Sequence, residues 1–244
     1  YKKGISDDFQ KFSTHPNYKE RIGIIQNNKK KVIEKKEHKF QTRFDYIKAK
    51  LIGYTEKNID NIDAFIQNKN SQNYGKAIML SKEGKLLDSL LLLNDLIKKF
   101  PDNEFFLETK ADILYNHSYT NEAEKFYKLS FIKNEKNFYV KKRLFEISYN
   151  KLDYNDNVSV NEFFETYKDL VFFNSNNLVF LEKWKTIFKF LNKKNWSLYL
   201  DFKMDLLEGN KSDALKKINY ILDNSNDKLL KKYSKKQRME LMNE

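Results

Sequence analysis

The chain has 244 residues, a formal net charge of +12 and no cysteine. The lack of cysteine excludes disulfides, thiolate metal sites and a cysteine nucleophile. The charge would suit an acidic partner, but arginine, the residue best suited to phosphate and base contacts, occurs at only four positions. We therefore expect no nucleic-acid partner and attribute the excess of lysine to a low-GC codon bias.

The first residue of the chain and the length of its apolar stretches lead to two expectations. The sequence begins at Tyr1 rather than Met, so we expect it to be part of a longer protein. The most apolar stretch, 86–97, is interrupted by Asp88, Asn94 and Asp95. It is far shorter than the roughly 20 apolar residues of a membrane span, and no transmembrane segment is expected.

Helical patterns run through almost the whole sequence, and no sustained alternation of apolar and polar residues indicates a sheet. We therefore predict an all-α fold. The first helix should begin at Pro16 and end near Asn27, because proline suits the first helical turn. The second should end near Gly53, a favourable residue after a helix, and has four apolar residues on one face: Phe40, Phe44, Ile47 and Leu51.

Residues 55–72 are polar and rich in asparagine, which is typical of a linker. Four apolar residues allow an alternative, a short helix within this segment: Ile59, Ile62, Phe65 and Ile66.

A self-match with a period of 34 residues follows the predicted linker. Lys76, Ala77 and Leu80 recur as Lys110, Ala111 and Leu114. This is the period of the tetratricopeptide repeat, a helix–turn–helix unit. Because one unit cannot bury its own apolar face, such units stack on one another, and the stack presents a binding surface.

The two repeats predict four helices, at 74–82, 86–100, 104–116 and 121–133, with turns at 83–85 and near Ser118. Small residues should allow the two helices of each unit to cross closely: Ala77 with Ser89, and Ala111 with Ala123. The period then becomes less regular. We predict helices at 137–150, 161–173 and 178–193. The sequence from Ser159 to Glu162 has the pattern of a capping box, which indicates the start of the helix at 161–173.

A further repeat unit is predicted at 196–223, in which Gly209 and Ala214 keep the spacing of Gly84 and Ser89. A basic amphipathic helix at 228–242 should close the array. The whole repeat domain is therefore predicted to span 73–244, as a solenoid of helical hairpins.

The residues present do not predict an active site. The three histidines, His15, His38 and His117, form no zinc-protease motif, and no glycine-rich phosphate loop occurs. We predict no catalytic residue, metal ligand or cofactor within this chain.

Binding is the function that the repeats and the aromatic residues favour, with a protein or peptide as partner. In a tetratricopeptide array the first helix of each unit lines the concave groove, and aromatic residues anchor interfaces well. The candidates for this groove are Tyr74, Ile78, Phe105, Asp112, Tyr115, Trp196 and Tyr199, together with Glu108 and Lys203. The alternative is that several of these residues pack between helices.

Two segments near the N-terminus resemble a known family. One runs from Phe9 to Ile22 and contains Thr14-His15-Pro16 and Glu20-Arg21-Ile22; the other is Arg43 to Tyr54. They are similar to the end of the peptidase domain in zinc metallopeptidases of the CAAX prenyl protease, HtpX-like and BepA-like type. Some of those enzymes continue into tetratricopeptide repeats.

This resemblance implies that residues 1–54 are the C-terminal end of a metallopeptidase domain. The parent would be a zinc endopeptidase of the bacterial envelope or periplasm, and its zinc-binding His-Glu-x-x-His motif would precede Tyr1. His15 could then approach the zinc site, or simply cap the helix at Pro16. The alternative is a free-standing tetratricopeptide scaffold without a peptidase.

Overall fold

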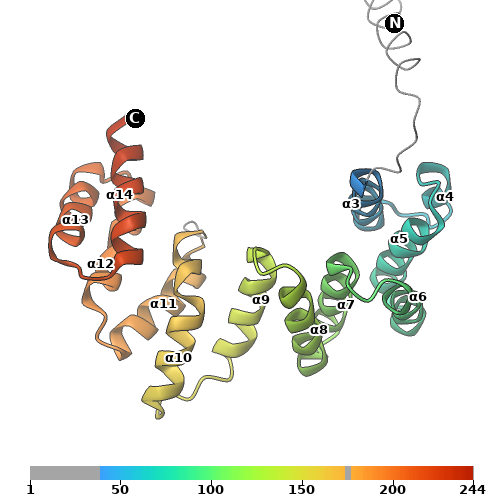
Figure 1. The fold of residues 1–244 in the computed structure, drawn as a ribbon, viewed down its shortest axis with the longest axis horizontal. Helices are drawn as coiled ribbons and strands as arrows, with labels where there is room; N and C mark the ends of the chain where they lie inside the picture. Colours follow the sequence, from blue (N-terminus) through green and yellow to red (C-terminus); the bar gives the residue numbers. More distant parts are fainter. Residues whose placement is uncertain (1–38, 174–176, 244) are drawn as a thin grey trace, which may run out of the picture. The chain divides into compact units, whose positions relative to one another are not determined.

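The structure is a computed structural model and describes residues 39–173 and 177–243. Within these ranges it contains twelve α-helices, one 3₁₀ helix and no β-strand, so the predicted all-α fold is confirmed (Figure 1). The first helices are α3 (Lys39–Thr55), α4 (Asn61–Phe65), α5 (Lys69–Lys82), α6 (Leu86–Lys99), α7 (Glu104–Asn116) and α8 (Thr120–Lys133). The others are α9 (Phe138–Tyr149), α10 (Asn157–Tyr167), η1 (Lys168–Phe172), α11 (Leu178–Phe190), α12 (Lys194–Leu207), α13 (Lys211–Asn224) and α14 (Lys228–Asn243).

The chain divides into two compact units, Tyr1–Gly75 and Lys76–Glu244. In the described part of the first unit, α3 contacts α4, and the rings of Tyr46 and Tyr74 meet edge to face at 6.2 Å. Gly75 allows a close approach of the backbones, because a Cβ atom there would lie 3.1 Å from the carbonyl oxygen of Ala49.

The predicted linker, 55–72, is partly helical and packed in the structure. It contains α4 and the start of α5, and the side chains of Ile62 and Ile66 are buried. The apolar residues that suggested a short helix therefore contribute to the first unit. The division into domains with their predicted functions stays a prediction.

Helix α3 differs from its prediction in two respects. It continues past Gly53 to Thr55, so Gly53 is a buried helical residue and not a cap. Phe44, Ile47 and Leu51 are more than half exposed, whereas Tyr46 and Ala49 are buried. The apolar period correctly indicated a helix, but the face packed within the first unit is the adjacent one.

In the second unit, helices pack against their neighbours in chain order. Contacts join α6 to α7, α7 to α8, α8 to α9, α9 to α10, α11 to α12, α12 to α13 and α13 to α14. This is the helical-hairpin architecture that the 34-residue period predicts.

Four tight turns in this unit share one hydrogen-bond pattern. A residue with positive φ follows each helix: Gly84, Ser118, Asn192 and Gly209. The next backbone N–H donates to the carbonyl five residues earlier, at 2.7–2.9 Å, as in the Schellman motif. The turn at Asn192 was not predicted; it ends α11 at Phe190, before the expected 193.

Small residues lie where the paired helices cross, as predicted. Ala77, Ser89, Ala111, Ala123 and Ala214 are fully buried. The hydroxyl of Ser89 also donates a hydrogen bond of 2.7 Å to the carbonyl oxygen of Ala77. A larger side chain at these positions would separate the two helices.

Helix α10 begins two residues before the predicted capping box, so that prediction is wrong. The carboxylate of Asp156 accepts a hydrogen bond from the N–H of Val158, so the helix begins at Asn157 and Ser159 lies inside it. An aspartate before the helix provides the acceptor that the first turn requires.

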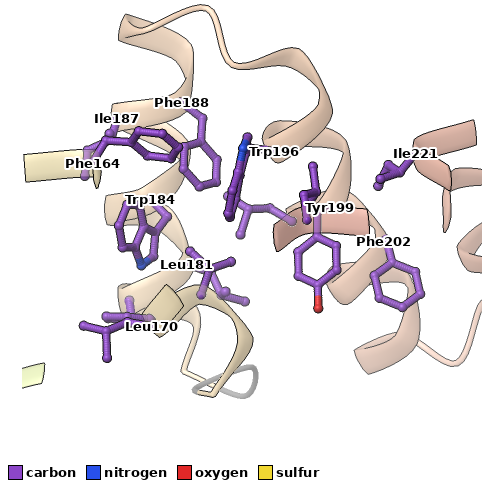
Figure 2. Packing of buried hydrophobic residues seen from close by; sticks show 14 of the residues in the cluster. Phe164, Leu170, Leu181, Trp184, Ile187, Phe188, Trp196, Tyr199, Phe202 and Ile221 are labelled. Atoms are coloured by element: carbon purple, nitrogen blue, oxygen red, sulfur yellow. The ribbon is translucent and has the colours of Figure 1, made fainter. Parts of the chain in front are cut away.

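An aromatic core extends through the helices from α9 to α14, and Figure 2 shows part of it. Trp184 is fully buried and its ring lies 5.3 Å from that of Phe188 and 5.1 Å from that of Phe145. The ring of Trp196 packs against Phe164 and Phe188. Each such side chain buries a large apolar area. This burial stabilises the packing of the helices between 137 and 195, where the repeat spacing is irregular.

Substitutions at two of these turns should change the free energy of unfolding in opposite directions. Gly84→Ala should lower the free energy of unfolding by about 1 kcal/mol, because a Cβ at positive φ is strained although space around Gly84 is open. Ser118→Gly should raise it by up to about 1 kcal/mol by relieving the same strain. Urea denaturation measures both; a change of the same sign in the two variants would contradict this role of positive φ.

Candidate functional site

Most of the residues predicted to line a groove are buried. Five are at most 6% exposed: Tyr74, Ile78, Asp112, Trp196 and Tyr199. Phe105 and Tyr115 are half-buried. The buried side chains pack between helices in this structure, as the alternative interpretation of the sequence allowed, and a groove along the first helices stays a prediction.

Trp196 and Tyr199 show this packing role. The indole Nε1 of Trp196 donates a hydrogen bond of 3.1 Å to Asp227, and the ring of Tyr199 lies 5.2 Å from that of Phe172. Both residues belong to the aromatic core of the second unit.

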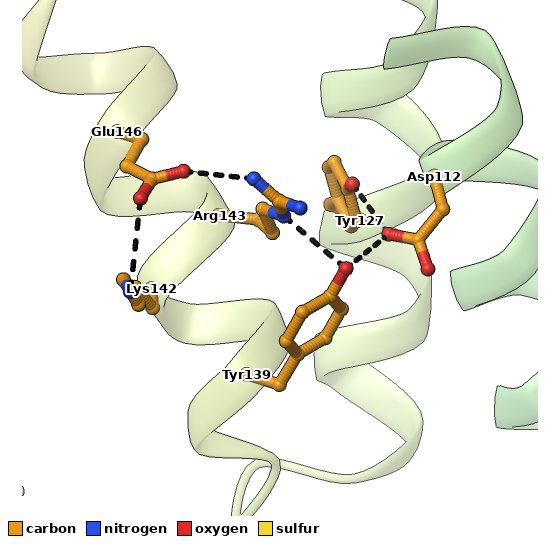
Figure 3. Close-up of polar contacts among 6 residues, drawn as sticks. All are labelled: Asp112, Tyr127, Tyr139, Lys142, Arg143 and Glu146. Atoms are coloured by element: carbon orange, nitrogen blue, oxygen red, sulfur yellow. Dashed lines mark hydrogen bonds and ion pairs between the residues drawn. The ribbon is translucent and has the colours of Figure 1, made fainter. Parts of the chain in front are cut away.

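A polar network joins α7, α8 and α9, and its centre, Asp112 with Tyr127, is buried (Figure 3). The carboxylate of Asp112 accepts hydrogen bonds from the hydroxyls of Tyr127, at 2.7 Å, and Tyr139, at 2.8 Å. Burial, and then the negative charge of Asp112, raise the pKa of both tyrosines well above the ordinary value. Both hydroxyls therefore stay protonated and act as donors.

The network extends along α9 through alternating charges. Arg143 donates from Nε to the hydroxyl of Tyr139, at 3.2 Å, and from a terminal nitrogen to Glu146, at 3.1 Å. Its guanidinium also lies over the ring of Tyr115, 5.2 Å from the centroid. Lys142 forms a looser ion pair with Glu146, at 4.0 Å. Arg143 is therefore held in place from several sides, while Lys142 is less constrained.

Asn137 connects the start of α9 to α7. Its side-chain oxygen accepts from the N–H of Val140 and so caps α9, while its amide nitrogen donates to Glu108 at 2.6 Å. Glu108 is itself largely buried. This pair of hydrogen bonds fixes the end of α9 that carries Phe138 and Tyr139.

A pocket of about 200 Å³ opens beside this network. It is lined by Phe138, Tyr139, Lys142, Leu170, Phe173 and Phe180. The rings of Phe138 and Phe173 lie 4.0 Å apart, yet both side chains are more than a third exposed. The pocket thus offers exposed aromatic surface with a single cationic side chain at its wall, and Tyr139 connects it to the buried network.

The 34-residue period also indicates this site in the sequence. Phe105, Glu108 and Asp112 lie 34 residues before Tyr139, Lys142 and Glu146. Carrying the groove positions of α7 one period further would have indicated this face of α9. Phe173 lies a further 34 residues after Tyr139 and continues the same series, whereas Phe180 is added by the tertiary structure.

The described residues were compared with the expectations for metal sites, membrane-spanning helices and histidines. The described residues contain no group of three or more His, Cys, Asp or Glu side chains that could hold a metal ion. No helix in the described ranges is long and apolar enough to cross a membrane. His117 lies 3.3 Å from the hydroxyl of Ser81; His15, His38 and the Phe9–Ile22 segment lie outside the described residues.

Lys203 is a buried cation in the second unit. Its side chain is 4% exposed and lies over the ring of Tyr199, 5.3 Å from the centroid. Burial lowers the pKa of Lys203 to about 8, an effect that the negative charge of Glu240 partly opposes. The predicted groove position of Lys203 is therefore part of the packed interior.

No model of a protein family matches the sequence, and no curated protein matches it.

The buried network predicts the effect of removing one hydroxyl. Tyr127→Phe should lower the free energy of unfolding by about 1.5–3 kcal/mol, because Asp112 loses a buried, charge-assisted hydrogen bond. Tyr220→Phe is the matched control, since Tyr220 is 54% exposed, and should change the stability by less than about 0.5 kcal/mol. Equal urea midpoints for the two variants would contradict the importance of the network.

The lowered pKa of buried Lys203 predicts that the stability of the protein depends on pH. Between about pH 8 and 10.5 the unfolded chain holds the proton that the folded chain has released, so stability should rise with pH in this window. Lys203→Met should therefore stabilise the protein by about 1–3 kcal/mol at pH 7, and the advantage should fade towards pH 10.5. The measurement is urea denaturation over this range, with the exposed Lys235→Met as control; a gain that does not vary with pH would contradict the burial of a charged amine.

Proposed function

We propose that this chain is a helical-repeat scaffold that binds a peptide segment of a partner protein at the pocket formed by α9, η1 and α11. The observation that carries the proposal is the aromatic pocket on α9, which adjoins a buried polar network. Hydrogen bonds to Asp112 and Arg143 restrain Tyr139 in the pocket wall. A surface held in this way loses little entropy when it binds.

The size of the pocket favours a side chain as its occupant. Sites for small molecules and cofactors usually enclose about 300 Å³ or more, whereas this pocket has about 200 Å³. Its walls are mainly aromatic, with Phe138, Phe173 and Phe180 as the apolar part. We therefore assign to it one bulky apolar side chain of the bound peptide.

The charges around the pocket favour an acidic residue next to that side chain. Arg143 is engaged by Tyr139 and Glu146 at hydrogen-bond distance, whereas Lys142 approaches Glu146 only to 4.0 Å. Lys142 can therefore turn towards a carboxylate of the peptide at low cost. The proposed ligand is a segment with a bulky apolar residue beside an acidic one.

Selection from a random peptide display library tests this function. The selected peptides should share the apolar–acidic pair, and Phe138→Ala/Phe173→Ala should weaken the binding of a selected peptide at least about tenfold, because it removes aromatic anchors. The control, Leu87→Ala/Val158→Ala, removes exposed apolar side chains elsewhere in the same unit and should change the affinity less than twofold. Absence of any enriched peptide, or equal loss in both variants, would refute the proposal.

We also propose, from the N-terminal resemblance, that the parent protein is a zinc metalloendopeptidase of the bacterial envelope. In that case the scaffold would recruit substrates or assembly partners, and zinc would be the cofactor of the parent. The support is the similarity of Phe9–Ile22 and Arg43–Tyr54 to that family; the first of these segments lies outside the described residues.

The coding sequence immediately upstream of Tyr1 tests the peptidase proposal. An in-frame His-Glu-x-x-His helix would support it, whereas a start codon with a signal peptide directly before Tyr1 would refute it. Cleavage of casein by the chain as it stands would also contradict it, because this proposal places the catalytic motif upstream.

A further inference from the structure

A second cavity, of about 390 Å³, lies between α11 and α12 and is lined by four lysines. These are Lys185, Lys189, Lys193 and Lys194, and the other lining residues are Phe188, Asn192, Ser197, Leu198 and Asp201. Asp201 is the only carboxylate in the lining, which therefore carries a formal charge of +3. Four ammonium groups around one cavity repel one another unless an anion is present.

The partners of these lysines leave most of this charge uncompensated. Lys185 pairs with Glu182 at 3.7 Å, and Lys193 lies over the ring of Phe164 at 4.7 Å. In the part of the chain that the structure describes, Lys189 and Lys194 form no ion pair, and both are exposed. Their ammonium groups can therefore reach a ligand in the cavity.

The backbone at this cavity also favours an anion. Lys193 and Lys194 mark the beginning of α12, a helix of 14 residues, so the positive end of its dipole lies at the cavity. Lys193 provides no side-chain acceptor to cap this helix. An anionic ligand would supply the acceptor that is missing at the helix start.

We propose that this cavity binds a ligand with two neighbouring phosphate groups. The lining charge of +3 falls to +2 once Glu182 pairs with Lys185. Two neighbouring phosphate groups carry at least about −2 and would balance it. The volume, unlike that of the pocket on α9, is in the range of small-molecule sites, above about 300 Å³. Leu198, which is half-buried, offers an apolar part of the wall for the remainder of the ligand. This site is independent of the proposed peptide-binding function.

Calorimetric titration with inorganic pyrophosphate tests the proposal. Binding should be saturable, and Lys189→Gln/Lys194→Gln should weaken it at least about tenfold, since each lost charged contact has an effect of this order. The matched control is Lys125→Gln/Lys235→Gln, which removes the same charge from two exposed lysines outside the cavity and should change the affinity less than twofold. No saturable binding of pyrophosphate or of vesicles, or equal weakening in both variants, would overturn the proposal.

Sedimentation with phosphatidylcholine vesicles containing cardiolipin distinguishes a lipid headgroup from a soluble ligand. Binding that requires Lys189 and Lys194 would assign the site to a membrane lipid, and pyrophosphate binding without sedimentation would assign it to a free phosphate compound. Amide NMR signals of the unaltered chain provide a measurement that does not depend on the folding of the variants. Pyrophosphate should shift the signals of residues 193–197, and signals that do not move would overturn the site.

Discussion

The close crossing of paired helices is the constraint on which the second unit depends. A helical hairpin buries its apolar face only when its two helices approach closely and the next hairpin covers the remainder. Fully buried alanine or serine residues at the crossings permit this approach, and the bond from Ser89 to the carbonyl of Ala77 fixes one of them. The left-handed turns then reverse the chain within a few residues, so each helix lies against its neighbour in sequence.

The same packing explains why the polar network can exist. Asp112 is a buried carboxylate, which would be costly without partners, but α8 and α9 each bring a tyrosine hydroxyl to it. Three successive helices therefore have to be in register for the network to form. The same register positions the pocket on α9, because Tyr139 belongs to both the network and the pocket wall.

The lysine-lined cavity depends on packing of another kind. The positive φ of Asn192 turns the chain between α11 and α12, and this turn brings the end of one helix and the start of the next to the same cavity. Lysines that are separated along the chain thereby surround one space. A high lysine content alone indicates only a positively charged surface, whereas this arrangement groups four lysines around one cavity.

The sequence predicted helices well where local signals act. The bounds of α7 and the small residues at the crossings follow from the repeat period and from capping by Asn103. Local signals failed where two of them competed: Asp156 and not Ser159 caps α10, and Gly53 lies within α3. Five of the seven principal groove candidates are buried, because period alone does not tell which side of a helix the next hairpin covers. Trp196 and Tyr199 thus became core.

The sequence by itself determined the all-α class, the repeat period and most helix bounds, because these depend on residues close together in the chain. Only the tertiary structure decided which aromatic side chains are buried, which hydroxyls meet Asp112 and which lysines share a cavity. These features depend on contacts between separate helices, as the bond from Asn137 to Glu108, 29 residues apart, illustrates. Their positions follow from packing geometry, which no local pattern of residues encodes.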